Sequence, residues 1–196
     1  MNSTKNLLPQ NGTVQYFCKI FSEEQSELYY VKLLNEIKWQ HDVVKIFGKE
    51  FVTKRKVALY ADEGITYQYT GKTKIAEHWT DLLLEIKSAI EEISGHTYNA
   101  CLLNLYHNGS EAMNWHADNE KEMLENSAIA SISFGAERKF GFRHKETKEI
   151  ISLILEKGSL LIMKDETQKY WKHKLFTNAK ITEPRVNLTF RTIVNR

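Results

Sequence analysis

The second half of this 196-residue chain is a succession of short segments in which β-branched, aromatic and other apolar residues alternate with polar ones. Such segments, separated by Gly, Asn and charged clusters, are typical of β-strands. They predict strands at 100–106, 129–134, 139–143, 150–155, 159–163, 173–176 and 185–194. Because so many short strands crowd one half of a small chain, we expect an antiparallel barrel or a jelly roll.

Two helices are expected ahead of the strands. Residues 22–25 match a capping box, and the helical spacing of Leu28, Val31, Leu34 and Ile37 predicts a helix with this apolar stripe that ends near Lys38. A second helix is predicted between about Trp79 and Ile93, with Gly95 as its stop. Its apolar stripe is formed by Leu82, Leu83, Ile86, Ile90 and Ile93. Residues 1–12 read as a loose arm. The expected fold class is therefore α+β, a single domain over 1–196 with N-terminal helices and a jelly-roll core, or double-stranded β-helix, at 100–194.

Composition narrows the class of protein without naming a function. The net charge of +2 is too small to indicate nucleic-acid binding by itself. Cys18 and Cys101 lie in apolar surroundings without CxxC spacing, so they are expected to be buried thiols in a reducing compartment. No signal-peptide core or apolar run of membrane-spanning length is present. We expect a monomeric cytoplasmic protein, nuclear in a eukaryote, that has no membrane partner.

One short segment has the spacing of a metal site. In NWHADNE (114–120), His116 and Asp118 would point to the same face of an extended chain. His173 lies 55 residues after Asp118 in a strand-like stretch and is the best third ligand. Two His and one carboxylate form the facial triad of non-haem Fe(II) oxygenases, which leaves coordination positions open. A surface His–Asp pair with an unrelated His is the alternative, since HxD often occurs by chance.

The C-terminal segment RVNLTFR (185–191) alternates with period two. One face carries Val, Leu and Phe, and the other carries Arg185, Asn187, Thr189 and Arg191. The two Arg Cα atoms would be roughly 20 Å apart, so both side chains leaning inward could hold the ends of a small dicarboxylate. A solvated strand face is the ordinary alternative.

Taken together, these residues resemble the AlkB family of Fe(II)- and 2-oxoglutarate-dependent nucleic-acid dealkylases, and most closely the branch that repairs double-stranded DNA. The resemblance implies that His116, Asp118 and His173 bind Fe(II). It implies a 2-oxoglutarate site made by Asn104, Tyr106, Arg185, Asn187, Thr189 and Arg191. The matching segments are IFGK (46–49), DEGITYQYTG (62–71), NLYHNG (104–109), HADNE (116–120), AIASISFGAERKFGFRH (128–144), GSLLIM (158–163) and PRVNLTFR (184–191).

The implied activity is oxidative demethylation of N-methylated bases in DNA, such as 1-methyladenine and 3-methylcytosine. It would consume O₂ and 2-oxoglutarate and release formaldehyde, succinate and CO₂. Because a base in a duplex must be extruded to react, the resemblance also implies a nucleotide-recognition lid at 40–75. Phe47 would be a wedge with Gly48 and Lys49 beside it, and Arg55 a DNA contact. Tyr67, Tyr69, Asn119 and Glu120 would hold the base.

Ordinary structural interpretations remain open for these positions. Phe47 could be a strand-end core residue, and the tyrosines a half-buried strand face. Basic clusters also lie where a DNA backbone could run, and each could instead be solvated surface: Lys45, Lys49, 54–56, 138–139, 143–145, Lys169, Lys172 and Lys174. The chain also departs from the duplex-repair branch: Asn119 stands where a second Asp is usual, Tyr69 where Phe is usual, and the connection at 145–150 is short. The same chemistry on RNA or single-stranded nucleic acid is therefore the second hypothesis. A catalytically silent jelly-roll binding module is the third.

Overall fold

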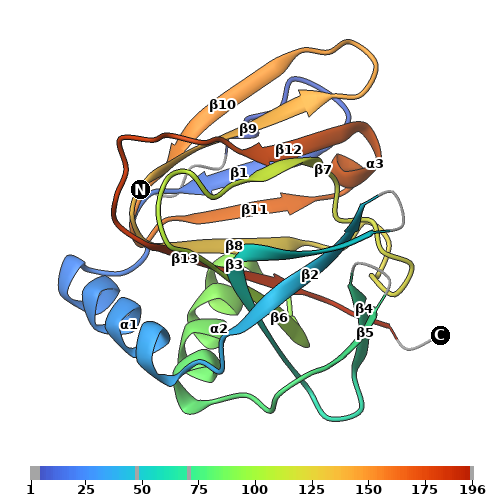
Figure 1. Ribbon diagram of the computed structural model, residues 1–196. Helices are drawn as coiled ribbons and strands as arrows, with labels where there is room; N and C mark the ends of the chain where they lie inside the picture. Colours follow the sequence, from blue (N-terminus) through green and yellow to red (C-terminus); the bar gives the residue numbers. More distant parts are fainter. Residues whose placement is uncertain (1–4, 47–48, 70–71, 195–196) are drawn as a thin grey trace.

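The computed structural model describes residues 5–46, 49–69 and 72–194, and its centre is a pair of antiparallel sheets that face each other (Figure 1). The predicted α+β jelly roll is confirmed. In order across the larger sheet, the strands are β1 (Thr13–Phe17), β11 (Leu160–Lys164), β8 (Ile129–Gly135), β13 (Arg185–Arg191), β6 (Ala100–Tyr106), β3 (Lys49–Ala61) and β2 (Gln40–Ile46). Those of the smaller sheet are β10 (Ile150–Leu155), β9 (Arg138–His144), β12 (Trp171–Leu175) and β7 (Met113–His116).

Each of the seven predicted strands is present, with ends that differ by a few residues. The largest difference is at the end of the chain, where β13 stops at Arg191 rather than Val194. A separate hairpin is formed by β4 (Thr66–Tyr69) and β5 (Lys72–Ile75) and lies, like the end of the β2–β3 hairpin, on the same side of the molecule as β7 and α3 (Figure 1). Both hairpins fall within the stretch expected to form the lid.

Helices α1 (Glu23–Glu36) and α2 (Asp81–Ser94) cover the outer face of the larger sheet (Figure 1). The capping box at Ser22 and Gln25 forms as predicted, and Gly95 ends α2 with a φ of 69°. The buried face of α1 was not the one expected. Leu28 and Val31 are exposed, whereas Tyr29 and Leu33 are buried.

The sheet explains this choice of face. Ser26 is buried and packs against Gly158, which precedes β11. A Cβ atom on Gly158 would lie 2.5 Å from the Ser26 Oγ. Only a small residue fits there, so the helix turns Ser26, Tyr29 and Leu33 inward. In α2 the stripe 82–90 is buried as expected, but Ile93 at its end is 37% exposed.

The N-terminal segment is packed rather than loose over the residues described. Leu8 is buried in the core inside the roll, and the Trp171 indole donates a hydrogen bond to the carbonyl of Gln10. Strand β1, which the sequence did not predict, follows and pairs with β11. The prediction for the thiols is correct for Cys101 and wrong for Cys18, which is exposed just after β1. No helix among the described residues is long and apolar enough to cross a membrane.

Candidate iron and 2-oxoglutarate site

Strands β7 and β12 are neighbours in the smaller sheet, and their register places His116 opposite His173. The Nε2 atoms of the two rings lie 3.0 Å apart, and Asp118 Oδ1 lies 3.6 Å from His116 Nε2 and 3.8 Å from His173 Nε2. Each of the three residues therefore presents one ligand atom to a common point, although His116 and His173 are 57 positions apart in the chain. Asp118 and His173 are buried, while the His116 side chain is 35% exposed at the mouth of the roll.

The protonation states of these groups suit a divalent metal. Burial would raise the pKa of Asp118, but the Arg191 guanidinium and both histidines outweigh it, so the pKa lies well below its usual range. Burial lowers the pKa of His173 to about 3, which keeps its ring neutral. The Nδ1–H of His116 donates to the carbonyl of Asn114 at 2.7 Å, which leaves Nε2 available as a ligand. Two imidazoles and one carboxylate match the Fe(II) facial triad.

The inner face of the larger sheet lies across from this triad. All seven residues of β13 are buried: Val186, Leu188 and Phe190 pack against the helices, and the alternate residues point into the roll. The solvated-face alternative is therefore wrong for this strand. The register with β6 sets Arg185 opposite Tyr106 and Asn187 opposite Asn104. A cavity of about 80 Å³ is lined by the triad and by Asn104, Tyr106, Arg185, Asn187, Thr189 and Arg191 together.

The two arginines differ in their partners. The Arg191 guanidinium donates a hydrogen bond to Asp118 Oδ2 at 2.7 Å, and so orients the carboxylate of the triad. Arg185 is 2% exposed, and its hydrogen bond goes to the Ser133 hydroxyl at 2.9 Å. No carboxylate of the described residues pairs with Arg185, and its Nε has no acceptor. A buried cation of this kind is a fit for one carboxylate of 2-oxoglutarate.

Other polar groups around the cavity support the same fit. Asn104 Oδ1 is buried without a hydrogen-bond donor. Ser131 accepts a hydrogen bond from Asn187, and Ser133 accepts the one from Arg185. These two serines were missed from the sequence, although the alternation in AIASISF places both on one face of β8. They orient the side chains that would hold the co-substrate.

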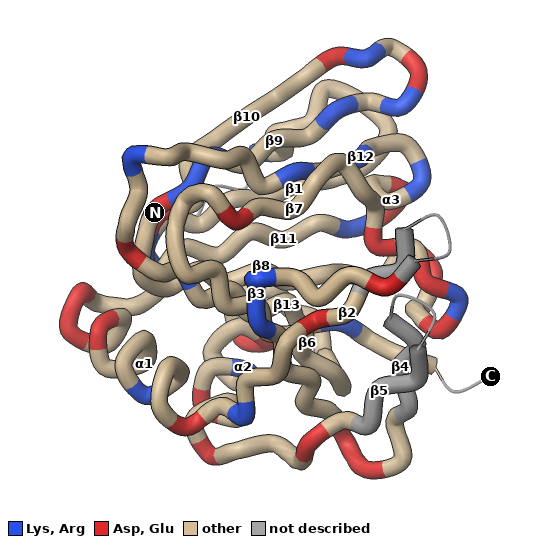
Figure 2. Tube along the Cα trace, viewed as in Figure 1, with Lys and Arg blue, Asp and Glu red and all other residues tan. Residues whose placement is uncertain are grey.

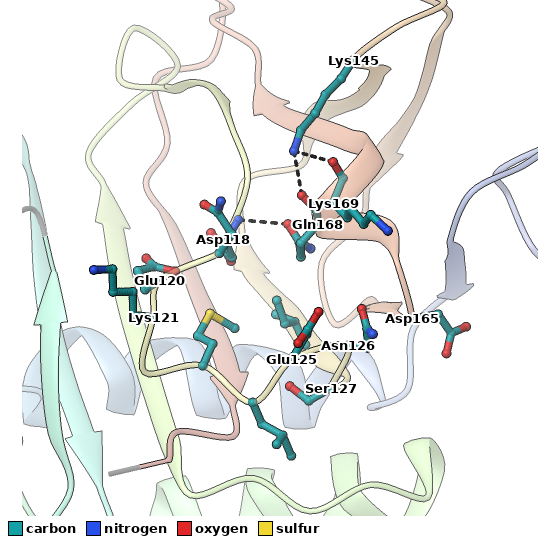
Figure 3. Close-up of a pocket in the computed structure, with 14 residues that line it drawn as sticks. Asp118, Glu120, Lys121, Glu125, Asn126, Ser127, Lys145, Asp165, Gln168 and Lys169 are labelled. Atoms are coloured by element: carbon teal, nitrogen blue, oxygen red, sulfur yellow. Dashed lines mark hydrogen bonds between the residues drawn. The ribbon is translucent and has the colours of Figure 1, made fainter. Parts of the chain in front are cut away.

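The residues expected to touch DNA lie in different environments. Asn119 is exposed, and Glu120 lines both the 80 Å³ cavity and an adjoining pocket of about 410 Å³ (Figure 3). Tyr67 and Tyr69 are on β4. Phe47 and Gly48 lie outside the described residues, and Lys49 begins β3.

Arg55 does not suit the role of a DNA contact. It is 5% exposed and forms a buried ion pair with Asp42 of the neighbouring strand β2. Arg138, part of another basic cluster, is also buried and donates to four backbone carbonyls in two loops. The sequence could not separate these arginines from surface ones, because their partners are distant in the chain.

Comparison with known proteins decides the family. Residues 13–191 match the model of the 2OG-Fe(II) oxygenase superfamily. The chain is 38% identical to the DNA oxidative demethylase ALKBH2 of Mus musculus over 185 residues, which are 90% of this chain and 74% of that protein. This chain belongs to the AlkB family of 2OG-Fe(II) oxygenases.

A second relative, the DNA oxidative demethylase ALKBH2 of Homo sapiens, is 36% identical over 186 residues, 89% of this chain and 71% of that protein. The solved structure of OsALKBH1 matches at a TM-score of 0.63 and 16% identity, covering 94% of this chain and 99% of that one, and shows the shared fold. This oxygenase therefore uses Fe(II), 2-oxoglutarate and O₂, which together supply the oxidising power to hydroxylate a C–H bond.

Proposed function

We propose that this oxygenase repairs alkylated DNA by oxidative demethylation of N-methylated bases such as 1-methyladenine and 3-methylcytosine. The observation that carries the proposal is the 36–38% identity, over about nine-tenths of the chain, to proteins named DNA oxidative demethylases. The intact triad and the buried unpaired Arg185 support it, because they are the parts that the chemistry requires. Every group of the site comes from one chain, so a monomer suffices. The enzyme would work where DNA is kept, in the nucleus or the prokaryotic cytoplasm.

The residues of this chain have distinct tasks in such a reaction. His116, Asp118 and His173 would hold the iron, and the pairing of Arg191 with Asp118 would keep that carboxylate charged and oriented. Arg185, with Tyr106, would bind one carboxylate of 2-oxoglutarate. The partly exposed ring of His116 faces the mouth, where the methylated base would lie. Glu120 is placed to accept a hydrogen bond from an exocyclic amine.

The outer face of the smaller sheet offers a path for a phosphate backbone. Alternate positions of β9 and β12 carry cations and no acids, and Figure 2 shows Lys and Arg along these strands. The half-exposed Trp115 of β7 lies among them, with the Arg143 guanidinium 4.7 Å and Lys174 Nζ 5.9 Å from its ring centre. A basic face with an aromatic ring binds nucleic acid by ion pairing and stacking. The cations are Lys139, Arg143, Lys172 and Lys174.

The test is an anaerobic incubation with Fe(II) and 2-oxoglutarate, followed by air and an oligonucleotide carrying one 1-methyladenine. Mass spectrometry measures loss of the methyl group from single-stranded and paired substrate. Loss of the methyl group in the duplex is expected. Succinate formation without demethylation of either DNA substrate would refute the proposal.

A second candidate is the same chemistry on RNA or single-stranded nucleic acid. It is favoured by the short turn between His144 at the end of β9 and Ile150 at the start of β10, which gives little reach toward an opposite strand. Competition between single-stranded DNA, duplex DNA and RNA with the same lesion separates the two. Phe47→Ala adds a second test, because a wedge predicts a much larger loss of activity on duplex than on single strands.

A further inference from the structure

The loop that carries Asp118 is fastened at one point to the segment that carries His173. The Asp118 N–H donates a hydrogen bond to Gln168 Oε1 at 2.9 Å, across 50 residues of sequence. Gln168 belongs to α3 (Thr167–Tyr170), a single turn that leads directly into β12. In Figure 3 its amide points at Asp118 from the opposite wall of the 410 Å³ pocket. One side chain therefore joins two parts of the triad.

The turn that holds Gln168 is itself held tightly. Thr167 is 1% exposed, and its hydroxyl contacts the carbonyls of Lys164 and Thr13 and accepts from the Thr13 N–H. Gly12 must lack a side chain here, because a Cβ would lie 2.6 Å from the Thr167 hydroxyl. On the other side, Lys145 Nζ donates to the carbonyls of Gln168 at 2.9 Å and of Lys169 at 2.6 Å. Gln168 thus has a fixed base from which to act.

Asp118 depends on its backbone being fixed. The carboxylate must stay near both His116 and His173 while it also accepts from Arg191. It is followed by the loop at 119–127, of which Asn119, Lys121 and the residues 124–126 are exposed. Backbone hydrogen bonds tie residues 122–124 of this loop to residues 192–194, away from His173. The hydrogen bond from the Asp118 N–H instead ties the start of the loop to α3, the turn that leads to His173.

We infer that Gln168 is a positioning residue for the iron site: it fixes the backbone of Asp118 relative to His173, and so sets the affinity of the triad for a divalent metal. It is not one of the three ligand residues, and it acts through the backbone of Asp118. Its Nε2 lies 3.6 Å from the Met163 sulfur, which orients the amide so that the oxygen faces Asp118. The inference concerns the iron site of the family and is independent of the proposed DNA substrate.

The experiment compares two variants that separate the acceptor from the volume of the side chain. Gln168→Met keeps the length but leaves the Asp118 N–H without an acceptor, whereas Gln168→Glu retains an acceptor at the same reach. Mn(II) affinity of the metal-free protein is measured by calorimetry, without turnover. We expect Gln168→Met to weaken Mn(II) binding about 10-fold or more, and Gln168→Glu to stay within about threefold of the wild type.

The control is Lys169→Met on the same turn, whose ammonium points away to Glu166. It should bind Mn(II) as the wild type does. The visible spectrum of the Co(II)-substituted protein reports ligand geometry and should change in Gln168→Met and be restored in Gln168→Glu, which a general loss of stability would not produce. Equal Mn(II) affinity and an unchanged Co(II) spectrum in Gln168→Met would overturn the inference. Failure of the wild type to bind Mn(II) would instead overturn the metal site.

Discussion

Arg185 provides the sharpest test of the co-substrate site, because its charge is buried without a carboxylate partner among the described residues. Burial, with a smaller effect of the Arg138 charge, lowers the pKa of Arg185 from 12.5 to about 10. At about 1.4 kcal/mol per pKa unit, burying this cation costs about 3 kcal/mol. Because the folded pKa lies below the unfolded one, the cost is present in full at every pH below about 10.

We therefore predict opposite effects of Arg185→Met on stability and on binding. The apo protein should become more stable: relief of about 3 kcal/mol is reduced by about 1 kcal/mol for the missing hydrogen bond to Ser133. Affinity for 2-oxoglutarate should fall, since two charge-assisted hydrogen bonds are worth about 3–6 kcal/mol, or about 100-fold at the least.

Urea unfolding of the apo protein measures the first effect, and calorimetric titration of the Mn(II)-loaded protein with 2-oxoglutarate under nitrogen measures the second. Arg185→Lys keeps the charge but not the planar fork and should bind with intermediate affinity. Arg143→Met, an arginine on the outer face of the smaller sheet, should leave 2-oxoglutarate binding unchanged. Unchanged 2-oxoglutarate affinity in Arg185→Met, or a loss of apo stability, would refute the reasoning.

Three further predictions concern the metal, the nucleic acid and the fold. Asp118→Ala should abolish succinate release as well as demethylation, and robust turnover would exclude the triad. Oligonucleotide affinity should fall as the salt concentration rises. In a Lys172→Gln, Lys174→Gln double variant, the slope of log K against log salt should become shallower by about 1 for each phosphate that these lysines neutralise. An unchanged slope would show that the two lysines do not contact the nucleic acid. Gly109→Ala places a Cβ 1.9 Å from the Asn178 carbonyl oxygen, so the backbone must move. The unfolding free energy should fall by about 1–3 kcal/mol. Ser110→Ala, at the exposed neighbouring position, should leave the unfolding free energy unchanged.

Local patterns predicted the strands well because their alternation is a direct consequence of having one apolar face. The alternation in RVNLTFR also separated the helix-facing residues of β13 from the cavity-facing ones. What the pattern could not show was whether the polar face lies in solvent or in a cavity. That depends on the smaller sheet, whose strands come from 113–116 and 138–175.

The errors at the two arginines have a common origin in contacts between distant residues. Arg55 is buried because Asp42 on the adjacent strand neutralises it, and Arg138 because two loops turn their carbonyls toward it. For both arginines the residue type and its neighbours in sequence are compatible with either environment, and the distant partner decides. Cys18 has a different origin: it is exposed just beyond the end of β1, a strand that the sequence did not predict.

Strand β13 shows how one segment can serve stability and chemistry at once. Val186, Leu188 and Phe190 are fully buried against the helices, and burial of each stabilises the fold by about 1.5–3 kcal/mol. That gain exceeds the cost of about 3 kcal/mol at Arg185 on the opposite face. The strand can therefore present a buried cation toward the cavity without unfolding. Binding of a dicarboxylate would then remove the cost. At the same concentration, 2-oxoglutarate should therefore raise the unfolding free energy of the wild type more than that of the Arg185→Met variant.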